Sequence, residues 1–510
     1  MLPIIHTLEM TAMMGHHPDS QKSLFCYAAN LEDRIPADHP LRLIQRHVDF
    51  DFVYDEVKDL YGIKGNVSIP PPVILKMMLL LILYNVRSER ELMKTIPLRL
   101  DWLWFLGYDL ESTIPDHSVL SKARRRWGAV LFKTFFERIV WQCVERGLVD
   151  GEKLFVDSSL IQADASNNSV VKRETIQLQI SSNFSILEAR LEDSKPTEKK
   201  PSDDHNDDDG EHPHSRVNRA HHSTTDPDAS VIRQGRGAPK LQYKIHRGVD
   251  EKAEVITTTE VTTGMVNEAH RLASLIDSHQ ENTTRPATTV VADTKYGTVD
   301  NYLTCHDRNI HAHMPDLKTR QDAAGLRKGI FPEEAFFYDP ATDTYRCPGN
   351  QVLKRRKQKK KRKAFEYGIS PRTCMSCPLR DQCTRSKTGR TIKRHLRQDD
   401  LNHMRQTAQS PRAKKDIRKR QSLMERSFAQ ATRYGFKRAR WRRIEKVRIQ
   451  EYLTASVQNI MILLRHAKEQ RPAQGVALAL LKQGILRFNQ IKSFVNRLIM
   501  FPRIALLQLC

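Results

Sequence analysis

The sequence predicts an α/β fold in which a mixed sheet is flanked by helices and follows an all-α N-terminal region. Three patterns support this prediction. Helical spacing of apolar residues dominates residues 1–148, two alternating β-branched runs form a hairpin further on, and a continuous apolar strand follows one more helix. The order strand, hairpin, helix, strand is typical of a mixed sheet covered by helices.

The charge balance restricts the class of partner. The chain has 83 Lys and Arg residues against 60 Asp and Glu residues, a formal net charge of +23. Such an excess attracts polyanions, of which nucleic acid is the commonest. Ribosomal-type and membrane-surface proteins share this sign of charge, so it predicts a partner and leaves the chemistry open.

Other features of composition indicate the compartment. The N-terminus MLPIIHTLEM lacks a basic region followed by a long apolar stretch, and the most apolar run, Val73–Tyr84, has only twelve residues. A membrane span needs roughly 20, so we interpret this run as a buried helix and expect no membrane contact. Eight cysteines in 510 residues are too sparse for a disulfide scaffold, which favours a reducing, cytoplasmic location.

The N-terminal region ends in a basic helix. After the helix breaker at Thr113–Pro115, the segment HSVLSKARRRWG begins a helix that carries several cations around one face. A compact helical unit with such a helix can lie on a DNA groove or backbone, although a solvated basic surface has the same pattern. We expect DNA contacts from Lys122, Arg124, Arg125 and Arg126.

Residues 149–466 carry the α/β pattern, and two insertions interrupt it. The strand LFVDSSL precedes a polar stretch, residues 166–222, which contains the low-complexity segment DSKPTEKKPSDDHNDDDGEHPHS and is predicted to be disordered. The hairpin LQYKIHRGVD/EVITTTEVTT, a helix at 267–278 and the strand 287–294 come next. A second insertion, residues 316–400, holds four cysteines and a basic run, and residues 467–510 form a helical tail without an assigned role.

Two aspartates in this region are candidates for metal binding. Asp157 interrupts an apolar strand, where an unpaired carboxylate is unfavourable. Asp293 follows the strand TTVVA where that strand meets its turn. Two acids on neighbouring strands can bind Mg²⁺ or Mn²⁺, and a pair of such ions roughly 4 Å apart promotes phosphodiester displacement. A lone strand aspartate is more often a turn or cap residue, so the prediction depends on the pair.

A third acid is expected from a helix beside the sheet. Glu425 is nearly alone among basic residues in KKDIRKRQSLMERSFAQATRYGFKRARWRR. Ile417, Met424 and Phe428 form an apolar stripe, and Glu425 shares the adjoining stripe with neighbouring polar residues. A surface ion pair is the simpler explanation for such an acid, so its position favours the metal role more than its charge pattern does.

Together these segments resemble the insertion-sequence transposases that have an N-terminal helical transposase domain and an RNase H-like DDE catalytic domain. The resemblance extends from about residue 25 to about residue 466. The segments on which this resemblance rests are PADHPLRLI, PDHSVLSKARRRW, LFVDSSLIQADAS, STTDPDA, LQYKIHRGVDEKAEVITTTEVTTGMVNEAH, VVADTKYGT and ERSFAQATRYGFKRARWRRIEKVRIQEYLTASVQN. It implies a catalytic triad of Asp157, Asp293 and Glu425 holding two Mg²⁺ or Mn²⁺ ions. It also implies nicking at transposon ends and attack of the freed 3′-hydroxyl on target DNA.

The helix around Glu425 departs from the family pattern. Members often have Tyr and Arg seven and four residues before the glutamate and Lys seven after it, where this chain has Arg418, Gln421 and Thr432. The nearest basic substitutes are Arg420 and Arg433. The alignment of this helix with the family motif is therefore open. Glu445 is the alternative third acid, and Asp164 is the alternative to Asp157.

The second insertion has the residue types of a structural zinc site. Four thiolates that include a C-x-x-C pair suit tetrahedral Zn²⁺, and the segments around them are predicted to be short strands. A redox-active C-x-x-C is the alternative, but no βαβ unit precedes it. The expected ligands are Cys347, Cys374, Cys377 and Cys383.

Basic residues elsewhere extend the expected DNA-binding surface. The run LKRRKQKKKRK, which includes Arg355 and Arg356, is either a solvated loop or a phosphate-binding segment without sequence specificity. The segment beyond the Glu425 helix is a second candidate surface, with Arg440, Trp441, Arg442 and Arg443.

Four functions are consistent with these patterns. The first is a DNA transposase, whose partners are transposon ends and target DNA and which acts as a homo-oligomer in a synaptic complex. The second is a transposase-derived protein that binds DNA without catalysis. A nuclease of the same fold and a basic structural protein are the remaining alternatives, and the last explains none of the acid positions.

Overall fold

The computed structural model describes residues 30–62, 66–173, 215–317 and 328–467. The predicted tail and most of the low-complexity segment lie outside these residues. Within them the chain divides into two compact units. One comprises residues up to Met77, Arg90–Asp116 and residues from Val457, and the other comprises Met78–Glu89 and His117–Ser456.

The N-terminal region is helical, as the sequence predicts. Its elements are α1 (Leu31–Arg34), α2 (Pro40–His47), α3 (Phe52–Val57), η1 (Lys58–Leu60), α4 (Pro71–Leu83), α5 (Glu89–Thr95), η2 (Ile96–Leu98) and α6 (Leu100–Leu106). Helix α4 contains the apolar run and is buried. Lys76 in this helix lies 5.4 Å from the Phe50 ring and 5.3 Å from the Phe105 ring. Burial lowers the pKa of Lys76 to about 8.

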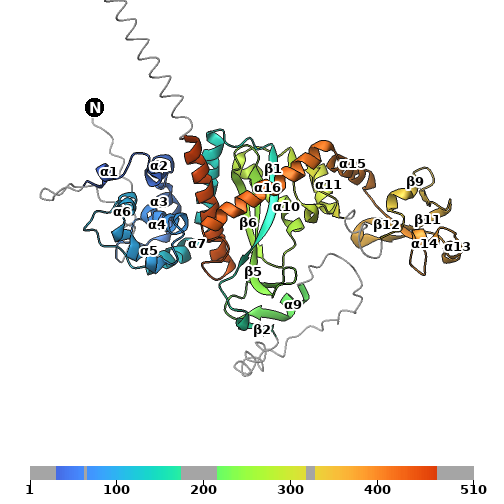
Figure 1. The fold of residues 1–510 in the computed structure, drawn as a ribbon, viewed down its shortest axis with the longest axis horizontal. Coiled ribbons are helices and arrows are strands. Elements are labelled where there is room, and N and C mark those ends of the chain that lie inside the picture. The colour runs from blue at the N-terminus through green and yellow to red at the C-terminus, as the bar shows by residue number, and fades with distance from the viewer. Residues whose placement is uncertain (1–29, 63–65, 174–214, 318–327, 468–510) are drawn as a thin grey trace, which may run out of the picture. The chain divides into compact units, whose positions relative to one another are not determined.

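The second unit is built on a mixed sheet of six strands (Figure 1). They are β1 (Lys153–Gln162), β4 (Ser230–Ile232), β5 (Lys240–Asp250), β6 (Ile256–Thr263), β7 (Thr289–Val291) and β8 (His311–His313). Strand β1 is central: it pairs antiparallel with β5 and parallel with β7, and β7 pairs parallel with β8. Strands β4 and β6 pair antiparallel with β5, so the predicted hairpin and buried strand are both present.

Helices cover both faces of this sheet. They are α7 (Ser118–Glu145), η5 (Glu268–Arg271), α10 (Leu272–Thr283), η6 (Thr294–Tyr296), α11 (Val299–Asp307), α15 (Gln398–Ala408), α16 (Pro411–Arg433) and a helix at residues 444–467. Alternate residues of β1 point to opposite faces. Leu154 and Val156 pack in a core with α10, α11 and α15, whereas Phe155 packs with α7 and α16. Asp157 has the same parity as Phe155, which places it on the α16 face.

Helix α7 has a break that the sequence pattern did not predict. Gly128 has φ 64° and ψ −175°, a conformation outside the helical region that glycine adopts readily. The basic segment that ends at Arg126 is therefore a separate helical piece from residues 129–145. Helix α7 belongs to the unit that contains the sheet, whereas the predicted domain boundary lay at residue 148.

The second insertion forms a five-stranded antiparallel sheet of its own. The strands are β9 (Phe337–Asp339), β10 (Thr344–Arg346), β11 (Val352–Lys359), β12 (Ala364–Gly368) and β13 (Thr391–His395). Short helices accompany them: η8 (Glu333–Ala335), η9 (Lys360–Arg362), α13 (Pro371–Met375) and α14 (Arg380–Cys383). The buried side chains Tyr345, Leu353 and Tyr367 form its core. The basic run, for which a solvated loop was one of two interpretations from the sequence, is largely the strand β11.

The first insertion is ordered at both ends, which corrects part of the disorder prediction for 166–222. The described ends are η3 (Asn167–Ser169), β2 (Val170–Lys172), α9 (Ser215–Ala220) and β3 (His221–Ser223). Strands β2 and β3 pair antiparallel, with Val171 opposite His222. Backbone pairing, which composition does not reveal, orders this polar sequence.

No helix among the described residues has the length and apolar character needed to cross a bilayer.

A buried ion pair joins the central sheet to the helix at 444–467. Arg247 on β5 donates to both oxygens of Glu451, at 2.7 and 3.0 Å, and both residues are at most 1% exposed. Arg247 lies directly opposite Asp157 on the neighbouring strand. The pair therefore fixes the strand next to the candidate site.

We expect Glu451→Gln to lower the free energy of unfolding by roughly 3–5 kcal/mol, because Arg247 would keep a buried charge without its counter-charge. Chemical denaturation measures the change. The matched control is Asp277→Asn, which removes the exposed partner of Arg308 and should cost less than about 1 kcal/mol. Equal, small losses in the two variants would contradict this role for the ion pair.

Candidate active site

The strand register brings the two predicted aspartates to the same level of the sheet. Phe155 on β1 pairs with Val291 on β7 in a parallel register. Asp157 and Asp293 each lie two residues beyond that pair, at the carboxyl end of β7. Two acids separated by 136 positions in sequence are thus neighbours in the fold, and each carboxylate lies within electrostatic range of the other.

Asp157 is a half-buried carboxylate under strong electrostatic influence. Its side chain is 26% exposed, and Arg420 donates to Oδ2 at 2.7 Å. Burial raises the pKa of Asp157, and the nearby Asp293 raises it further. Arg420 opposes both effects. The net direction is upward, because burial and Asp293 outweigh Arg420.

Asp293 shapes the turn that follows β7. It is the N-cap of η6, and its side chain accepts a hydrogen bond from the backbone N–H of Lys295 at 3.0 Å. This use occupies one oxygen, Oδ1. A cap residue of this kind fixes the direction of its own carboxylate.

Helix α16 crosses β1 and contacts β1, β7 and β8 (Figure 1). The predicted apolar stripe is present, since Ile417, Met424 and Phe428 pack against one core cluster. Arg420 is the residue of this helix that reaches Asp157. Glu425 is exposed and accepts a hydrogen bond from Gln421 at 3.2 Å. Its carboxylate points to a different side of the helix, because five residues correspond to a rotation of roughly 140°.

The alternative acids make surface ion pairs with arginines. Asp164 pairs with Arg438 at 2.9 Å and with Arg442 at 3.3 Å. Glu445 pairs with Arg448 at 2.9 Å.

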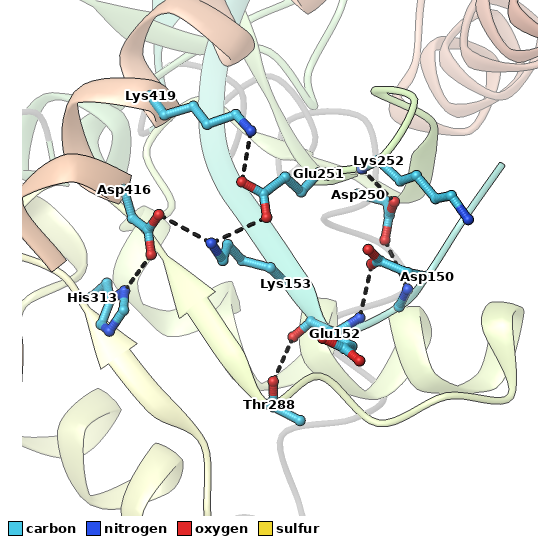
Figure 2. Close-up of polar contacts among 11 residues, drawn as sticks. Asp150, Glu152, Lys153, Asp250, Glu251, Lys252, Thr288, His313, Asp416 and Lys419 are labelled. Carbon is cyan, nitrogen blue, oxygen red and sulfur yellow. Dashed lines mark hydrogen bonds and ion pairs between the residues drawn. The ribbon is translucent and has the colours of Figure 1, made fainter. Parts of the chain in front are cut away.

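A chain of charged side chains holds α16 against the start of β1 (Figure 2). Asp416 accepts from Lys153 at 3.0 Å and from His313 at 2.8 Å. Lys153 also pairs with Glu251, which in turn pairs with Lys419. Burial lowers the pKa of His313 against the attraction of Asp416. Because Asp416 precedes Arg420 by four residues, this network also sets the position of Arg420 beside Asp157.

The four clustered cysteines converge on one small cavity. Cys347, Cys374, Cys377 and Cys383 all line a cavity of about 30 Å³ within the second insertion. None of them is in a disulfide. Burial raises the pKa of Cys383, and its three neighbouring thiols add to that effect.

Two glycines leave the room that this arrangement needs. A Cβ at Gly389, where φ is +88°, would lie 2.9 Å from the Cys374 sulfur. A Cβ at Gly349 would lie 3.2 Å from the Cys377 sulfur. Within the described residues, however, no group of three or more His, Cys, Asp or Glu side chains is close enough to chelate a metal ion. This applies to the cysteines and to the acids alike.

The structure corrects two of the predicted DNA-binding residues. Arg124 is 5% exposed, forms an ion pair with Glu89 at 2.5 Å, and stacks 4.0 Å over the Trp441 ring. Arg440 donates to the Val86 carbonyl and to Asn85, both at 2.5 Å. Both guanidinium groups are used inside the unit, because a charge pattern does not reveal which side of a segment is packed.

The other predicted cations remain exposed to different degrees. Lys122, Arg125 and Arg126 lie on the open side of α7. Arg442 and Arg443 are each 55% exposed, although Arg442 pairs with Asp164. On the smaller sheet, Arg355 is half-exposed and pairs with Asp343, while Arg356 donates to the Ile369 carbonyl.

Sequence reasoning missed two residues beside the acidic pair. Glu268 is buried at the start of η5, and Lys295 Nζ lies 2.7 Å from its Oε1. Lys295 is two residues after Asp293, a proximity visible in the sequence. No sequence signal connects it to Glu268, which lies 27 positions earlier in a segment that resembles an ordinary helix start.

Comparison with known protein families identifies the chain. Residues 29–126 match the family described as Transposase domain (DUF772), and residues 346–464 match the family described as Transposase DDE domain. The two matches support an insertion-sequence DDE transposase. The second match covers strands β11, β12 and β13 of the cysteine-bearing sheet, helix α16 and most of the helix at 444–467. A search of curated proteins finds no significant match.

We expect Arg124→Ala to destabilise the transposase by roughly 3–5 kcal/mol, because Glu89 would lose its buried counter-charge. At temperatures where this variant remains folded, the salt dependence of its DNA affinity should equal that of the parent. The comparison variant is Arg125→Ala, which removes an exposed charge from the same helix and should reduce the slope of log K against log salt by about 1. A reduced slope for Arg124→Ala at parental stability would contradict the structural role.

Proposed function

We propose that this DDE transposase nicks transposon ends in a metal-dependent reaction and transfers the resulting 3′-hydroxyl to target DNA. One observation carries the proposal. Asp157 and Asp293 occupy matching positions on adjacent parallel strands, in a chain whose flanking segments match transposase families. Two carboxylates so placed form the minimum oxygen donor set for a hard divalent cation.

The topology of the sheet supports an RNase H-like catalytic domain. The strand order is β6, β5, β1, β7, β8, in which the first three strands form an antiparallel meander and the last two run parallel to β1. We assign β1 and β7 the role of acid-bearing strands in this domain. The helical region that precedes α7 and the cysteine-bearing sheet are then its N-terminal partner and its insertion.

Glu425 is the proposed third acid. Helix α16 contains two acidic residues, Asp416 and Glu425. Both oxygens of Asp416 accept from Lys153 and His313, so that residue is engaged in holding the helix. Glu425 has an exposed carboxylate on the helix that contacts Asp157. Recruitment of Glu425 to the acidic pair requires a change in its side-chain position relative to this structure.

The carboxylates on β1 and after β7 are of the donor type that the family's divalent cations prefer, although three such groups do not meet among the described residues of this structure. The raised pKa of Asp157 reflects burial and the like charge of Asp293, and Arg420 supplies the compensating positive charge here. Asp157 and Asp293, with Glu425, would hold Mg²⁺ or Mn²⁺. Such ions, when bound, activate the attacking oxygen and neutralise charge on the leaving oxygen. The contribution of the chain is to fix the carboxylates: β1 and β7 set their register, and the Lys295 N–H orients Asp293.

A structural Zn²⁺ is proposed for the four cysteines. Their convergence on one cavity, and the two glycines that leave space around the sulfurs, support this assignment. Four thiolates leave no open coordination position. The metal would stabilise the five-stranded sheet to which β11 belongs.

We propose that DNA binds to two basic surfaces, one on α7 and one on β11. The exposed cations Lys122, Arg125 and Arg126 lie on α7, and Arg355 with Arg356 lies on β11. We propose that they neutralise phosphates without reading bases. We further propose that the transposase acts as a homo-oligomer in a synaptic complex.

We expect Asp157→Asn, Asp293→Asn and Glu425→Gln each to reduce end joining by at least about 10³-fold, because each would remove a metal-binding charge from the transition state. Joining is measured on cognate end DNA with Mg²⁺ or Mn²⁺, and binding is measured by anisotropy. Binding should remain within a few-fold of the parent.

The controls are Asp164→Asn and Glu445→Gln, which remove the two acids in surface ion pairs and should leave joining at the parental rate. Parental joining by Asp157→Asn and Asp293→Asn would contradict the proposal. An inactive parent that still binds ends would identify a non-catalytic DNA-binding protein, and cleavage without joining would identify a nuclease.

We expect the parent to contain about one zinc per chain and Cys377→Ser to lose it, because three thiolates no longer complete the tetrahedral set. Elemental analysis of the purified protein measures the content. The control Cys305→Ser alters a buried cysteine outside the cluster and should retain the metal. Zinc-free parental protein that keeps its thermal stability would contradict the assignment.

A further inference from the structure

Glu268 is a buried acid whose side-chain oxygens are both occupied. It is 4% exposed. Lys295 Nζ lies 2.7 Å from Oε1, Ser158 Oγ donates to Oε2 at 2.6 Å, and Lys244 Nζ lies 3.3 Å from Oε2. Burial by itself raises the pKa of Glu268, yet these three partners lower it to about 2. Glu268 is therefore an ionised anchor and not a free ligand.

The residues that Glu268 holds are chain neighbours of the acidic pair. Ser158 follows Asp157 on β1, and Lys295 is two residues beyond Asp293 in η6. Tyr296, which is fully buried, lies within electrostatic range of Glu268, Asp157 and Asp293, and burial with these charges raises its pKa well above the ordinary value. Glu268 thus connects both acid-bearing segments from the sheet face opposite α16.

Three cations contact Glu268 or Asp157, and they differ in their exposure to solvent. The side chain of Lys244 is 6% exposed and that of Arg420 is 12% exposed. The Lys295 side chain is 61% exposed, while its ammonium is attracted by Glu268, Asp293 and Asp157. Of these three, Lys295 is the cation that a bound nucleic acid can reach.

We propose that the Lys295 ammonium contacts the scissile phosphate of DNA bound at the Asp157–Asp293 edge, with Glu268 as the positioning residue that holds it there. This inference rests on the proposed function. Phosphoryl transfer spreads negative charge over the non-bridging oxygens, and a cation fixed in advance beside them lowers the barrier without reorganisation. Lysine suits this task as a point charge.

The geometry explains why an acid accompanies this lysine. An exposed lysine side chain samples many rotamers, and fixing it costs up to about 2 kcal/mol of side-chain entropy. The Glu268 carboxylate is itself fixed by Ser158 and Lys244, so it restricts Lys295 before DNA arrives. The ammonium keeps two further N–H groups for phosphate oxygens.

The test is single-turnover end joining with Mg²⁺ on cognate end DNA by Lys295→Met. We expect a fall in rate on the order of 10²-fold at saturating DNA, with a change in dissociation constant of less than about fivefold. Lys295→Arg should recover part of the rate. The matched control is Lys252→Met, which removes an exposed lysine charge near the start of β1 and should join at the parental rate.

A double-mutant cycle tests the positioning role of Glu268. Glu268→Gln should slow joining about as much as Lys295→Met, and adding it to Lys295→Met should produce little further loss. Ser158→Ala, which loosens Glu268 without removing a charge, provides a second variant if Glu268→Gln folds poorly, and the same non-additivity is expected.

Parental joining by Lys295→Met, or fully multiplicative losses in the cycle, would overturn this inference. A different result would reject the proposed function itself: Asp157→Asn would then join ends. If only the proposed role of Lys295 is wrong, Asp157→Asn is inactive and Lys295→Met joins ends.

Discussion

The site depends on the placement of two like charges at one level of a parallel strand pair. The register between β1 and β7 leaves Asp157 and Asp293 side by side, where burial and the nearby charge of Asp293 raise the pKa of Asp157. The surrounding structure supplies positive charge in response. Arg420 approaches Asp157 from α16, and Lys295 approaches both acids from the turn after β7. This arrangement of charges is the basis for proposing divalent cations and phosphate chemistry at the site.

The scaffold positions these charges through ion pairs that differ in burial. Arg247 and Glu451 fix the strand opposite Asp157, and Asp416 with Lys153 fixes the helix that carries Arg420. Each of these pairs joins segments far apart in sequence. Their arrangement is therefore a property of the fold, and loss of one partner leaves a buried charge that the core tolerates poorly.

The sequence predicted the elements that depend on local pattern. Alternation revealed the β5–β6 hairpin, apolar continuity revealed β7, and helical spacing revealed the stripe of Ile417, Met424 and Phe428. Asp157 and Asp293 were identifiable because an acid within or directly after an apolar strand is unusual. The cysteine spacing likewise indicated a cluster that the structure brings to one cavity.

Long-range packing accounts for what the sequence did not reveal. Arg124 and Arg440 belong to basic segments, but only the fold decides which cations turn inward to Glu89 and to Asn85. The Glu268–Lys295 contact depends on the packing of η5 against η6 on the sheet face opposite α16. The ends of the first insertion are ordered by pairing of β2 with β3, which their polar composition does not indicate. The direction of Glu425 depends on the rotation of α16, set by Asp416 and Arg420.

Mn²⁺ binding tests the central claim most directly, because it measures the cation site without requiring cognate DNA ends or turnover. Electron paramagnetic resonance of free Mn²⁺ would follow titration of the parent and of a variant that combines Asp157→Asn with Asp293→Asn. The parent should bind at least one Mn²⁺ that the double variant loses, while both keep the same fold by circular dichroism. Equal Mn²⁺ binding by the two proteins would contradict the assignment of the acidic pair as the metal site.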